Sequence, residues 1–551
     1  MPVLLPYPFI GPFDYAVPPG HAYAPGDIVL VPLNRRQEVG VVWDAPAGPT
    51  VPDSKLKPVT AAVEAPPIPA PLRRLVDWVA GYTLSAPGDV LAMALRVNAL
   101  TPPPVAAGWH AVPDVTGIRL TPQRTRVLAV LGDRILPGAD LARLADVGGS
   151  VIRGMADAGL LQAAPVPAEM PFARPNPDFI APHFSPAQEK VAAELRRLTE
   201  AASFSVTLLD GVTGSGKTEV YLEAVGACLR AGKQALILLP EIALSAQFLD
   251  RFARRFGTAP ALWHSDLGSR TRRVTWRAVA DGIARVVVGA RSALFLPFPD
   301  LGLVIIDEEH ETAFKQEEGV VYHARDMAVV RARFSAAPAI LVSATPSLET
   351  LANVEAGRYG HLHLAARHGG ATLPSIAAID MREHPPPRGK FLSPTLVQAA
   401  RARFARGEQV MLFLNRRGYA PLTLCRACGH RLACPNCTAW LVEHRARREL
   451  ACHHCGHTEP APTICPVCAA ENTMAPIGPG VERITEEAAD LFPDARRLVM
   501  ASDTMPGPHA ATAAARAIEA REVDLLIGTQ IVAKGWHFPH LTLVAVVDAD
   551  M

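Results

Sequence analysis

The sequence predicts a multidomain α/β protein with two α/β lobes, a metal-binding module inserted into the second lobe, and two smaller domains ahead of them. Three observations lead to this prediction. A glycine-rich phosphate-binding motif stands between an apolar strand and a helix. Two series of apolar strands alternate with helical segments, and eight of nine cysteines fall between Cys425 and Cys468. Because 551 residues exceed a single core, we expect roughly three to five domains.

The first domain is expected to be small and β-rich and to cover residues 1–98. Two apolar, β-branched runs at 27–31 and 39–43 flank a polar turn at 34–37, a pattern typical of a hairpin. Residues 72–82 place apolar side chains at helical spacing. The aromatic residues of that helix could pack within the domain or stack on bases, and packing is the default interpretation.

The second domain, residues 99–180 with its linkers, is predicted to be a winged helix. Its helical patterns cover 122–131, 139–145 and 150–158, and a strand follows from residue 159. Asp140 and Ser150 are plausible N-caps for the second and third helices. Winged helices often bind DNA, but a fold by itself does not establish binding.

The two lobes are read from apolar strands that alternate with helices, the pattern of a parallel sheet covered on both faces. The first lobe is assigned to residues 181–355 and the second, incomplete, to residues 356–551. The strand candidates are 235–239, 286–288, 304–306 and 340–342 in the first lobe, and 409–414, 525–527 and 543–547 in the second.

The phosphate-binding motif reads G-x-x-x-x-G-K-T and consists of Gly211, Val212, Thr213, Gly214, Ser215, Gly216, Lys217 and Thr218. Its glycines let backbone N–H groups turn toward phosphate oxygens at the start of a helix. Lys217 is expected to reach the β- and γ-phosphates, and Thr218 to bind Mg²⁺. The competing interpretation is a glycine-rich turn before an ordinary helix, which the strand before the motif and the helix after it disfavour.

Acidic residues follow the apolar run 304–306 in the order Asp307-Glu308-Glu309-His310. At the carboxyl end of a parallel strand such acids face the nucleotide site. Asp307 is predicted to hold Mg²⁺ and Glu308 to orient and deprotonate the attacking water. The alternative is a helix N-terminus with favourable acidic residues. The segment 343–346, Ser-Ala-Thr-Pro, follows another strand and is a weak signal in isolation.

Four CxxC pairs lie in a module that we assign to residues 425–470. Eight thiolates suffice for two tetrahedral Zn²⁺ sites, and a segment this short and polar lacks a sufficient core without metal. Iron–sulfur ligation suits paired CxxC knuckles less well. Spacing alone does not fix which pairs share an ion. The ligands are Cys425, Cys428, Cys434, Cys437, Cys452, Cys455, Cys465 and Cys468; the ninth cysteine, Cys228, is expected to pack in a core.

Bulk properties add little about partners. The net charge of +1 argues neither for nor against nucleic acid, so any basic surface must be local. The apolar N-terminus lacks a basic start and is broken by prolines, unlike a signal peptide. No run approaches the ~18 apolar residues of a membrane span.

These motifs, in this order and over the whole chain, resemble the PriA family of bacterial replication-restart helicases (primosomal protein N′), which belong to helicase superfamily two. The stretches that carry the resemblance are FDY at 13–15, VPLNRR at 31–36, SPAQ at 185–188, GVTGSGKTEVY at 211–221, LPEIAL at 239–244, GARSA at 289–293, DEEH at 307–310, FKQ at 314–316, YHARD at 322–326, NRRGY at 415–419, GTQ at 528–530 and AKG at 533–535.

The resemblance implies two RecA-like helicase lobes, the cofactors ATP and Mg²⁺, and ATP-driven 3′-to-5′ unwinding at stalled or abandoned replication forks that initiates primosome assembly. It also implies an N-terminal domain that binds a 3′ DNA end, and a contact between Gln188 and the adenine. The implied zinc pairing is nested, with Cys425, Cys428, Cys465 and Cys468 on one ion and Cys434, Cys437, Cys452 and Cys455 on the other. Implied partners are forked and single-stranded DNA, single-strand-binding protein and helicase-loading proteins of the primosome, in the cytoplasm at the nucleoid.

Some positions depart from the family pattern. Val481 stands where the family usually has threonine, and residues 501–504 and 536–538 are altered forms of family segments. No QxxGRxGR motif is present, and the arginine of such a motif is typically worth ~10³–10⁵ in rate. The prediction is therefore a C-terminally truncated chain with little hydrolysis, and the alternative function is a non-catalytic scaffold that binds fork DNA. An RNA helicase or restriction translocase is disfavoured by the cysteine insertion and the end-binding domain.

Overall fold

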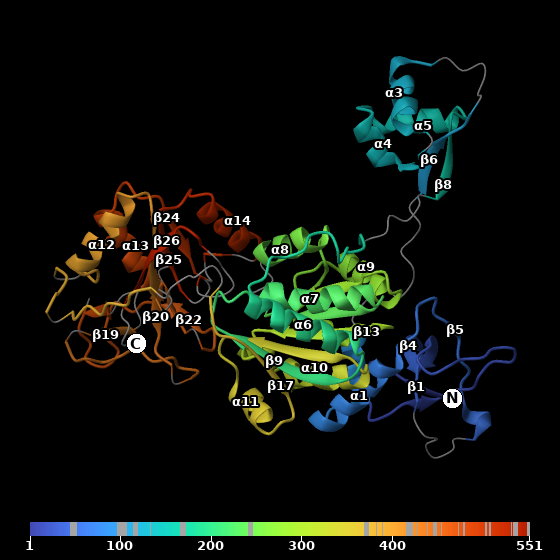
Figure 1. Cartoon of the computed structure of the whole chain (residues 1–551), viewed down its shortest axis with the longest axis horizontal. Coiled ribbons are helices and arrows are strands. Elements are labelled where there is room, and N and C mark those ends of the chain that lie inside the picture. The colour runs from blue at the N-terminus through green and yellow to red at the C-terminus, as the bar shows by residue number, and fades with distance from the viewer. Residues whose placement is uncertain are drawn as a thin grey trace. The chain divides into compact units, whose positions relative to one another are not determined.

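The computed structural model describes most of the chain (Figure 1). The contacts within the chain divide it into two units. One unit consists of Met1–Pro240 and Phe252–Gly370, and the other of Glu241–Arg251 and Ala371–Met551. The described residues are 1–44, 52–95, 107–113, 120–132, 134–165, 172–240, 246–367, 374–381, 383–387, 390–414, 422–425, 427–437, 439–444, 449–452, 454–471, 473–477, 480–501, 504–505, 508–529, 532 and 538–547.

The N-terminal domain is a five-stranded sheet with two helices. The strand order is β2-β1-β4-β3-β5, from β1 (Pro2–Leu4), β2 (Phe13–Asp14), β3 (Ile28–Leu33), β4 (Arg36–Val42) and β5 (Ala61–Ala62). The predicted hairpin is β3–β4, with Asn34 at φ 54° in its turn. The predicted helix is α1 (Ala70–Thr83), followed by α2 (Pro87–Ala94). On α1, the Trp78 and Tyr82 rings stack with centroids 4.8 Å apart.

The winged helix forms as expected, from α3 (Pro122–Leu131), α4 (Gly138–Leu144) and α5 (Gly149–Asp157) with a sheet ordered β7-β6-β8. Its strands are β6 (Ala107–Ala111), β7 (Leu136–Pro137) and β8 (Leu161–Pro165). The predicted N-caps were wrong. Pro137 and Gly148 occupy the cap positions in extended conformations, without side-chain cap bonds. Asp140 lies inside the first turn of α4, where its charge still suits the helix dipole.

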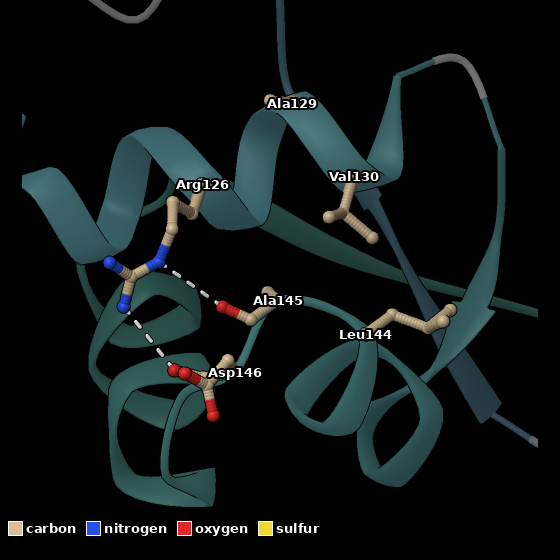
Figure 2. Close-up of a pocket in the computed structure, with 6 residues that line it drawn as sticks. All are labelled: Arg126, Ala129, Val130, Leu144, Ala145 and Asp146. Atoms are coloured by element: carbon tan, nitrogen blue, oxygen red, sulfur yellow. Dashed lines mark hydrogen bonds between the residues drawn. The ribbon is translucent and has the colours of Figure 1, made fainter.

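A hollow of about 310 Å³ lies between α3 and the end of α4 in this domain (Figure 2). Arg126 lies across it, and its guanidinium donates to the carbonyl oxygens of Ala145 and Asp146. The side chains of Val130 and Leu144 supply its apolar part. None of the residues predicted to carry chemistry lines this hollow.

The first lobe is built on a seven-stranded parallel sheet ordered β11-β12-β10-β13-β16-β9-β17. The strands are β9 (Ser205–Gly211), β10 (Gln234–Leu238), β11 (Ala261–Trp263), β12 (Val286–Gly289), β13 (Leu301–Asp307), β16 (Pro338–Ser343) and β17 (Gly360–Leu364). The helices are α6 (Pro186–Glu200), α7 (Lys217–Arg230), α8 (Ala246–Phe256), α9 (Ser269–Ala280), α10 (Ala324–Phe334) and α11 (Leu348–Glu355). The four strands predicted from apolar runs are all present.

The N-terminal domain and the first lobe share one apolar core. Buried residues of α1, including Leu72, Leu75 and Val76, belong to the same cluster as buried residues of α9 and α10. Polar contacts join the two domains as well. Trp276 Nε1 donates to the carbonyl of Ala94 at 2.9 Å, and Arg74 donates to the carbonyl of Phe334 at 2.6 Å. The N-terminal domain and the first lobe, which the winged helix separates in sequence, are therefore two parts of one packed body.

The second lobe has a four-stranded parallel sheet ordered β24-β25-β18-β26. Its elements are β18 (Gln409–Leu414), β24 (Arg497–Met500), β25 (Leu525–Gly528), β26 (Leu541–Val547), α12 (Pro394–Phe404), α13 (Val481–Leu491) and α14 (Pro508–Glu519). The cysteine module interrupts this lobe after β18. It contains the ladder of β19 (Leu422–Cys425) with β23 (Met474–Ile477), and a sheet of β20 (Val442–His444), β21 (Glu449–Ala451) and β22 (Thr458–Pro460).

Among the described residues, no helix combines the length and the apolar character that spanning a bilayer requires.

Candidate functional site

The phosphate-binding loop has a backbone that only glycine fits at several positions. Gly214 and Gly216 adopt φ values of 81° and 84°, in the left-handed region that other residues avoid. A Cβ on Gly211 would lie 2.6 Å from the carbonyl oxygen of Leu364, and one on Gly216 would lie 2.5 Å from Gln188 Nε2. The loop ends at the start of α7, where unpaired N–H groups favour an anion.

Three observations on this loop fit a nucleotide phosphate chain. Thr213 and Gly214, in the middle of the loop, are exposed to solvent. The Ser215 hydroxyl is buried and has no hydrogen-bond partner. Thr218 lies in the first turn of α7 and is partly buried.

Lys217 folds back over the loop. Its Nζ donates to the carbonyl of Gly211 at 2.8 Å and to that of Val212 at 3.4 Å. Burial lowers the pKa of Lys217, while the charges of Glu308, Asp307 and Asp210 oppose that effect. The ammonium group thus lies among loop carbonyls and carboxylates, and a triphosphate would offer it stronger acceptors.

Asp307 is the last residue of β13 and Glu308 follows it, at the same edge of the sheet as the loop. Asp307 Oδ2 accepts from the Tyr221 hydroxyl at 2.9 Å, and its Oδ1 accepts from the Glu308 N–H at 3.0 Å. Burial, and next the Glu308 charge, raise the pKa of Asp307 to about 6. Glu308 has φ 52°, an uncommon conformation for a non-glycine residue. This acid pair beside Lys217 is what a divalent cation would neutralise.

Gln188 is buried against the loop. It is the N3 residue of a capping box with Ser185, and its Nε2 donates to the carbonyl of Ser215 at 2.8 Å. Its Oε1 accepts from the Ser185 N–H at 2.9 Å. The structure therefore brings Gln188 to the loop that precedes α7.

Sequence reasoning assigned no individual role to Glu309, which joins the acidic motif to the segment after β16. Glu309 is fully buried. Its carboxylate accepts from the Ser347 N–H at 2.7 Å, the Thr350 hydroxyl at 2.9 Å and Arg325 Nη1 at 3.2 Å. All three partners follow Glu309 by 16 residues or more, so no local pattern indicates them.

His310 makes a second connection of this kind. Its Nδ1 lies 2.8 Å from the Ser343 hydroxyl, which also accepts from the Thr345 N–H at 3.0 Å. The Ser-Ala-Thr-Pro segment, weak as a sequence signal, is therefore in direct contact with the acidic motif. A displacement of the acidic motif would therefore be transmitted to the 343–346 segment, and the reverse.

The cysteines form two quartets, each with its sulfur atoms within 4.8 Å of one another. One quartet is Cys425, Cys428, Cys465 and Cys468, and the other is Cys434, Cys437, Cys452 and Cys455. Within the quartets, the sulfur atoms of Cys425 and Cys468, of Cys428 and Cys465, of Cys434 and Cys455, and of Cys437 and Cys452 lie 3.4–3.7 Å apart. Tetrahedral Zn²⁺ with Zn–S of about 2.3 Å needs sulfurs about 3.8 Å apart. The nested pairing matches the expectation from the family resemblance, and the quartets fit two Zn²⁺ ions.

The knuckles repeat one local design. In three of the four knuckles, the N–H of the residue directly after the second cysteine donates to the carbonyl of the first cysteine; the donors are Gly429, Gly456 and Ala469. These three residues have φ values of 75°, 78° and 57°. The ninth cysteine, Cys228, is buried on α7 as predicted, and burial raises its pKa to about 12.

Several predicted motif residues lie outside the described part of the chain, namely 241–244, 415–419, 530 and 533–535. The N-terminal segments are placed: residues 13–14 form the edge strand β2, and residues 31–36 run through the β3–β4 turn.

A loop of this geometry beside a paired acid, on a parallel α/β sheet, defines the class of P-loop nucleotide-binding proteins. Three family models match the chain: a 3′DNA-binding domain over residues 2–96, a DEAD/DEAH box helicase over 185–354, and the Cys-rich region domain of the PriA DNA helicase over 434–460.

Curated relatives extend the match to the whole chain. The replication restart protein PriA of Rickettsia felis is 37% identical over 551 residues, which cover 100% of this chain and 74% of that protein. PriA of Haemophilus influenzae is 35% identical over 98% of this chain and 75% of its own length. PriA of Bacillus subtilis is 39% identical over 75% of this chain and 52% of its own length.

The chain belongs to the PriA family of replication restart proteins, and with that family it is an ATP-dependent DNA helicase. Its fold is the one expected from the sequence: helicase lobes with a cysteine-rich zinc module, preceded by a 3′DNA-binding domain.

Proposed function

We propose that residues 211–218, Asp307 and Glu308 bind and hydrolyse ATP, and that the chain uses this energy to move 3′-to-5′ along DNA at stalled or abandoned replication forks. The observation that carries the proposal is the meeting of the glycine loop and the acid pair. Lys217 lies among loop carbonyls, and the charges of Asp307 and Glu308 act on it.

Each residue has a proposed role. The backbone N–H groups of the loop and Lys217 Nζ hold the phosphate oxygens. The Thr218 hydroxyl and the Asp307 carboxylate hold Mg²⁺, which when bound neutralises charge on the transferred phosphoryl group. Glu308 accepts the proton of the attacking water. Gln188 contacts the adenine, and its bond to the Ser215 carbonyl fixes it to the same loop.

Hydrolysis is proposed to be coupled to DNA through the contacts of the acidic motif. His310 bonds to Ser343, and Glu309 bonds to Arg325 at the start of α10 and to Ser347 before α11. A movement of Glu308 on hydrolysis would therefore be transmitted in two ways to segments outside the nucleotide site. One way passes through Glu309, and the other through His310. One of these segments, YHARD at 322–326, resembles the family's loop that links DNA binding to hydrolysis.

The remaining parts are assigned as follows. Residues 1–98 bind a DNA 3′ end, 99–180 form the winged helix and linker, 181–355 the first lobe, and 356–551 the second lobe with the zinc module at 425–470. We propose that the chain acts at the nucleoid in the cytoplasm. Its proposed partners are forked and single-stranded DNA, single-strand-binding protein and helicase-loading proteins of the primosome.

The test is a Lys217→Ala variant compared with Lys190→Ala, which removes an exposed lysine from α6 in the same lobe. We expect Lys217→Ala to lower ATP turnover on forked DNA by about hundredfold or more, because it removes a charge aimed at the reacting phosphates. DNA affinity, measured by fluorescence anisotropy, should be unchanged in both variants. Equal turnover in the wild type and Lys217→Ala would contradict the assignment.

A second measurement tests the substrate and the direction of movement. Forks, blunt duplex and RNA are compared as stimulators of ATP turnover, and partial duplexes with a 3′ or a 5′ single-stranded tail are compared in unwinding. We expect forks and single strands to stimulate most, with affinity falling steeply with salt because phosphate contacts dominate. Unwinding that requires a 5′ tail would overturn the proposed polarity.

A further inference from the structure

A cluster of two histidines and one aspartate lies at the edge of the first-lobe sheet and has no role in the proposed reaction. Asp210 lies on β9, and His361 and His363 lie on the edge strand β17. The two strands pair in parallel, with His363 opposite Asp210. Since side chains two residues apart on a strand share a face, both imidazoles are on the same side as that carboxylate.

The three side chains meet at one point. Asp210 Oδ1 lies 2.9 Å from His361 Nε2 and 2.8 Å from His363 Nδ1. The candidate ligand atoms all lie within 4.8 Å of one another. The histidine side chains are 42% and 51% exposed, whereas that of Asp210 is 18% exposed. The cluster therefore has a sheltered carboxylate beneath two imidazoles that solvent can reach.

We propose that Asp210, His361 and His363 bind a divalent transition-metal ion of the Zn²⁺ type, separate from the two ions of the cysteine module. Two imidazole nitrogens and one carboxylate oxygen suit Zn²⁺, Co²⁺ or Ni²⁺, whereas Mg²⁺ and Ca²⁺ favour all-oxygen sites. Three protein ligands leave at least one coordination position for water. The exposure of the histidines makes this ion exchangeable, unlike an ion enclosed by four cysteines.

Such an ion would connect β17 to β9 immediately before the phosphate-binding loop. Gly211 follows Asp210, and a Cβ there would lie 2.6 Å from the carbonyl oxygen of Leu364, the last residue of β17. That carbonyl also accepts from the Val212 N–H at 3.3 Å. The ion would thus add a link between the first residues of the loop and β17, which among the described strands pairs with β9 alone.

The competing account is a hydrogen-bonded cluster in which the carboxylate accepts from both imidazoles and no ion binds. The two accounts are separated by metal content. The full chain, with its cysteine sites filled, is equilibrated against buffered Zn²⁺ at increasing free concentration, and bound zinc per chain is measured. The variants are His361→Ala/His363→Ala and, as a control, His183→Ala, which removes an exposed histidine elsewhere in the same unit.

We expect wild type and His183→Ala to take up one zinc ion beyond those of the cysteine quartets, and the double variant to lose that ion or bind it more than about tenfold more weakly. Added Zn²⁺ should raise the thermal midpoint of the wild type and not that of the double variant, because a ligand that binds only the folded state stabilises it. Uptake that stops at the cysteine sites, or an extra ion that persists in the double variant, would overturn the proposal. His361→Gln, which removes one ligand at similar size, gives the same comparison if the double variant does not fold.

Discussion

At the scale of single residues, the carboxylates of Asp307 and Glu308 repel each other when no cation is bound. Asp307 is partly buried at the end of β13, where its carboxylate accepts from the Tyr221 hydroxyl and the Glu308 N–H. Its pKa is raised to about 6 by burial first and by Glu308 second. We expect such a raised carboxyl pKa in a site that binds a cation well, once the cation is removed.

The first prediction concerns Asp307→Asn in Mg²⁺-free buffer without chelator. The pKa of this carboxyl rises from 3.8 to about 6 when the chain folds. Its full contribution to the free energy of unfolding is therefore present only below the unfolded-state pKa, and it is lost as the pH rises through the folded-state pKa. Asp307→Asn should therefore stabilise the first lobe by about 1–3 kcal/mol at pH 8, with no gain below pH ~4.

The measurement is the midpoint of thermal or urea unfolding as a function of pH. Asp266→Asn, a change at an exposed aspartate of the same lobe, is the control and should leave the pH profile as in the wild type. A gain from Asp307→Asn that is the same at pH 4 and pH 8 would show that the ionised carboxylate is not the cause.

At the scale of elements, the strand–loop–helix unit depends on two glycines that have similar backbone angles and different surroundings. Gly214 and Gly216 both have φ above 80°. A Cβ on Gly214 would meet nothing within 4 Å, whereas one on Gly216 would lie 2.5 Å from Gln188 Nε2. Alanine substitutions at Gly214 and Gly216 therefore separate two free-energy costs, that of the left-handed backbone and that of displacing the Gln188 side chain.

The second prediction is that Gly216→Ala destabilises the first lobe more than Gly214→Ala. Each substitution should cost roughly 1–2 kcal/mol for the left-handed backbone. Gly216→Ala also displaces the Gln188 amide, which donates to the Ser215 carbonyl at 2.8 Å, and so loses about another 1 kcal/mol. Urea unfolding gives both values.

The double-mutant cycle with Gln188→Ala supplies the control. In that background the contact is already absent, so Gly216→Ala and Gly214→Ala should become equal in cost. A difference that survives in the Gln188→Ala background would place its origin outside the Gln188 contact.

At the scale of the whole molecule, the described parts differ in what stabilises them. The N-terminal domain and first lobe share a large apolar core, with residues such as Leu75, Trp276 and Ile306 in one cluster. The cysteine module has a small cluster of its own that includes Cys434 and Cys452. A segment of this kind gains its folding free energy from metal binding.

The third prediction is that zinc removal unfolds the module and spares the rest. After chelation, amide hydrogen exchange should rise across residues 422–477, while strands such as β9 and β13 keep their protection. Cys434→Ser should lose one bound zinc, because it breaks one quartet. Cys228→Ala, which changes the buried cysteine outside the quartets, should keep both ions. Unchanged exchange in the module after metal removal would refute the prediction.

Local patterns were enough to predict much of this molecule. The glycine loop, the acidic motif and the CxxC pairs are contiguous in sequence, and the apolar strand runs coincide with β10, β12, β13 and β16. Fully buried parallel strands read as continuous apolar runs, which is why the lobes were visible without a structure.

Contacts between distant segments were not predictable in the same way. The Tyr221 hydroxyl reaches Asp307 across 86 residues, and Asp210 meets His363 across 153 residues. Nothing in the spacing of these residues indicates such contacts, because they depend on the strand order of the sheet. The caps of α4 and α5 failed for the opposite reason: a local rule was applied, and Pro137 and Gly148 supplied the helix start instead.

Because the two cysteine quartets are nested in sequence, the outer quartet lies where the module joins the second lobe. Cys425 is the last residue of β19 and pairs with Met474 of β23, so the outer quartet sits directly on the two strands that leave and re-enter the lobe. The inner quartet lies entirely within the segment between these two strands. Loss of the ion held by the outer quartet should therefore free the two connecting strands from each other, whereas loss of the ion held by the inner quartet should leave them joined.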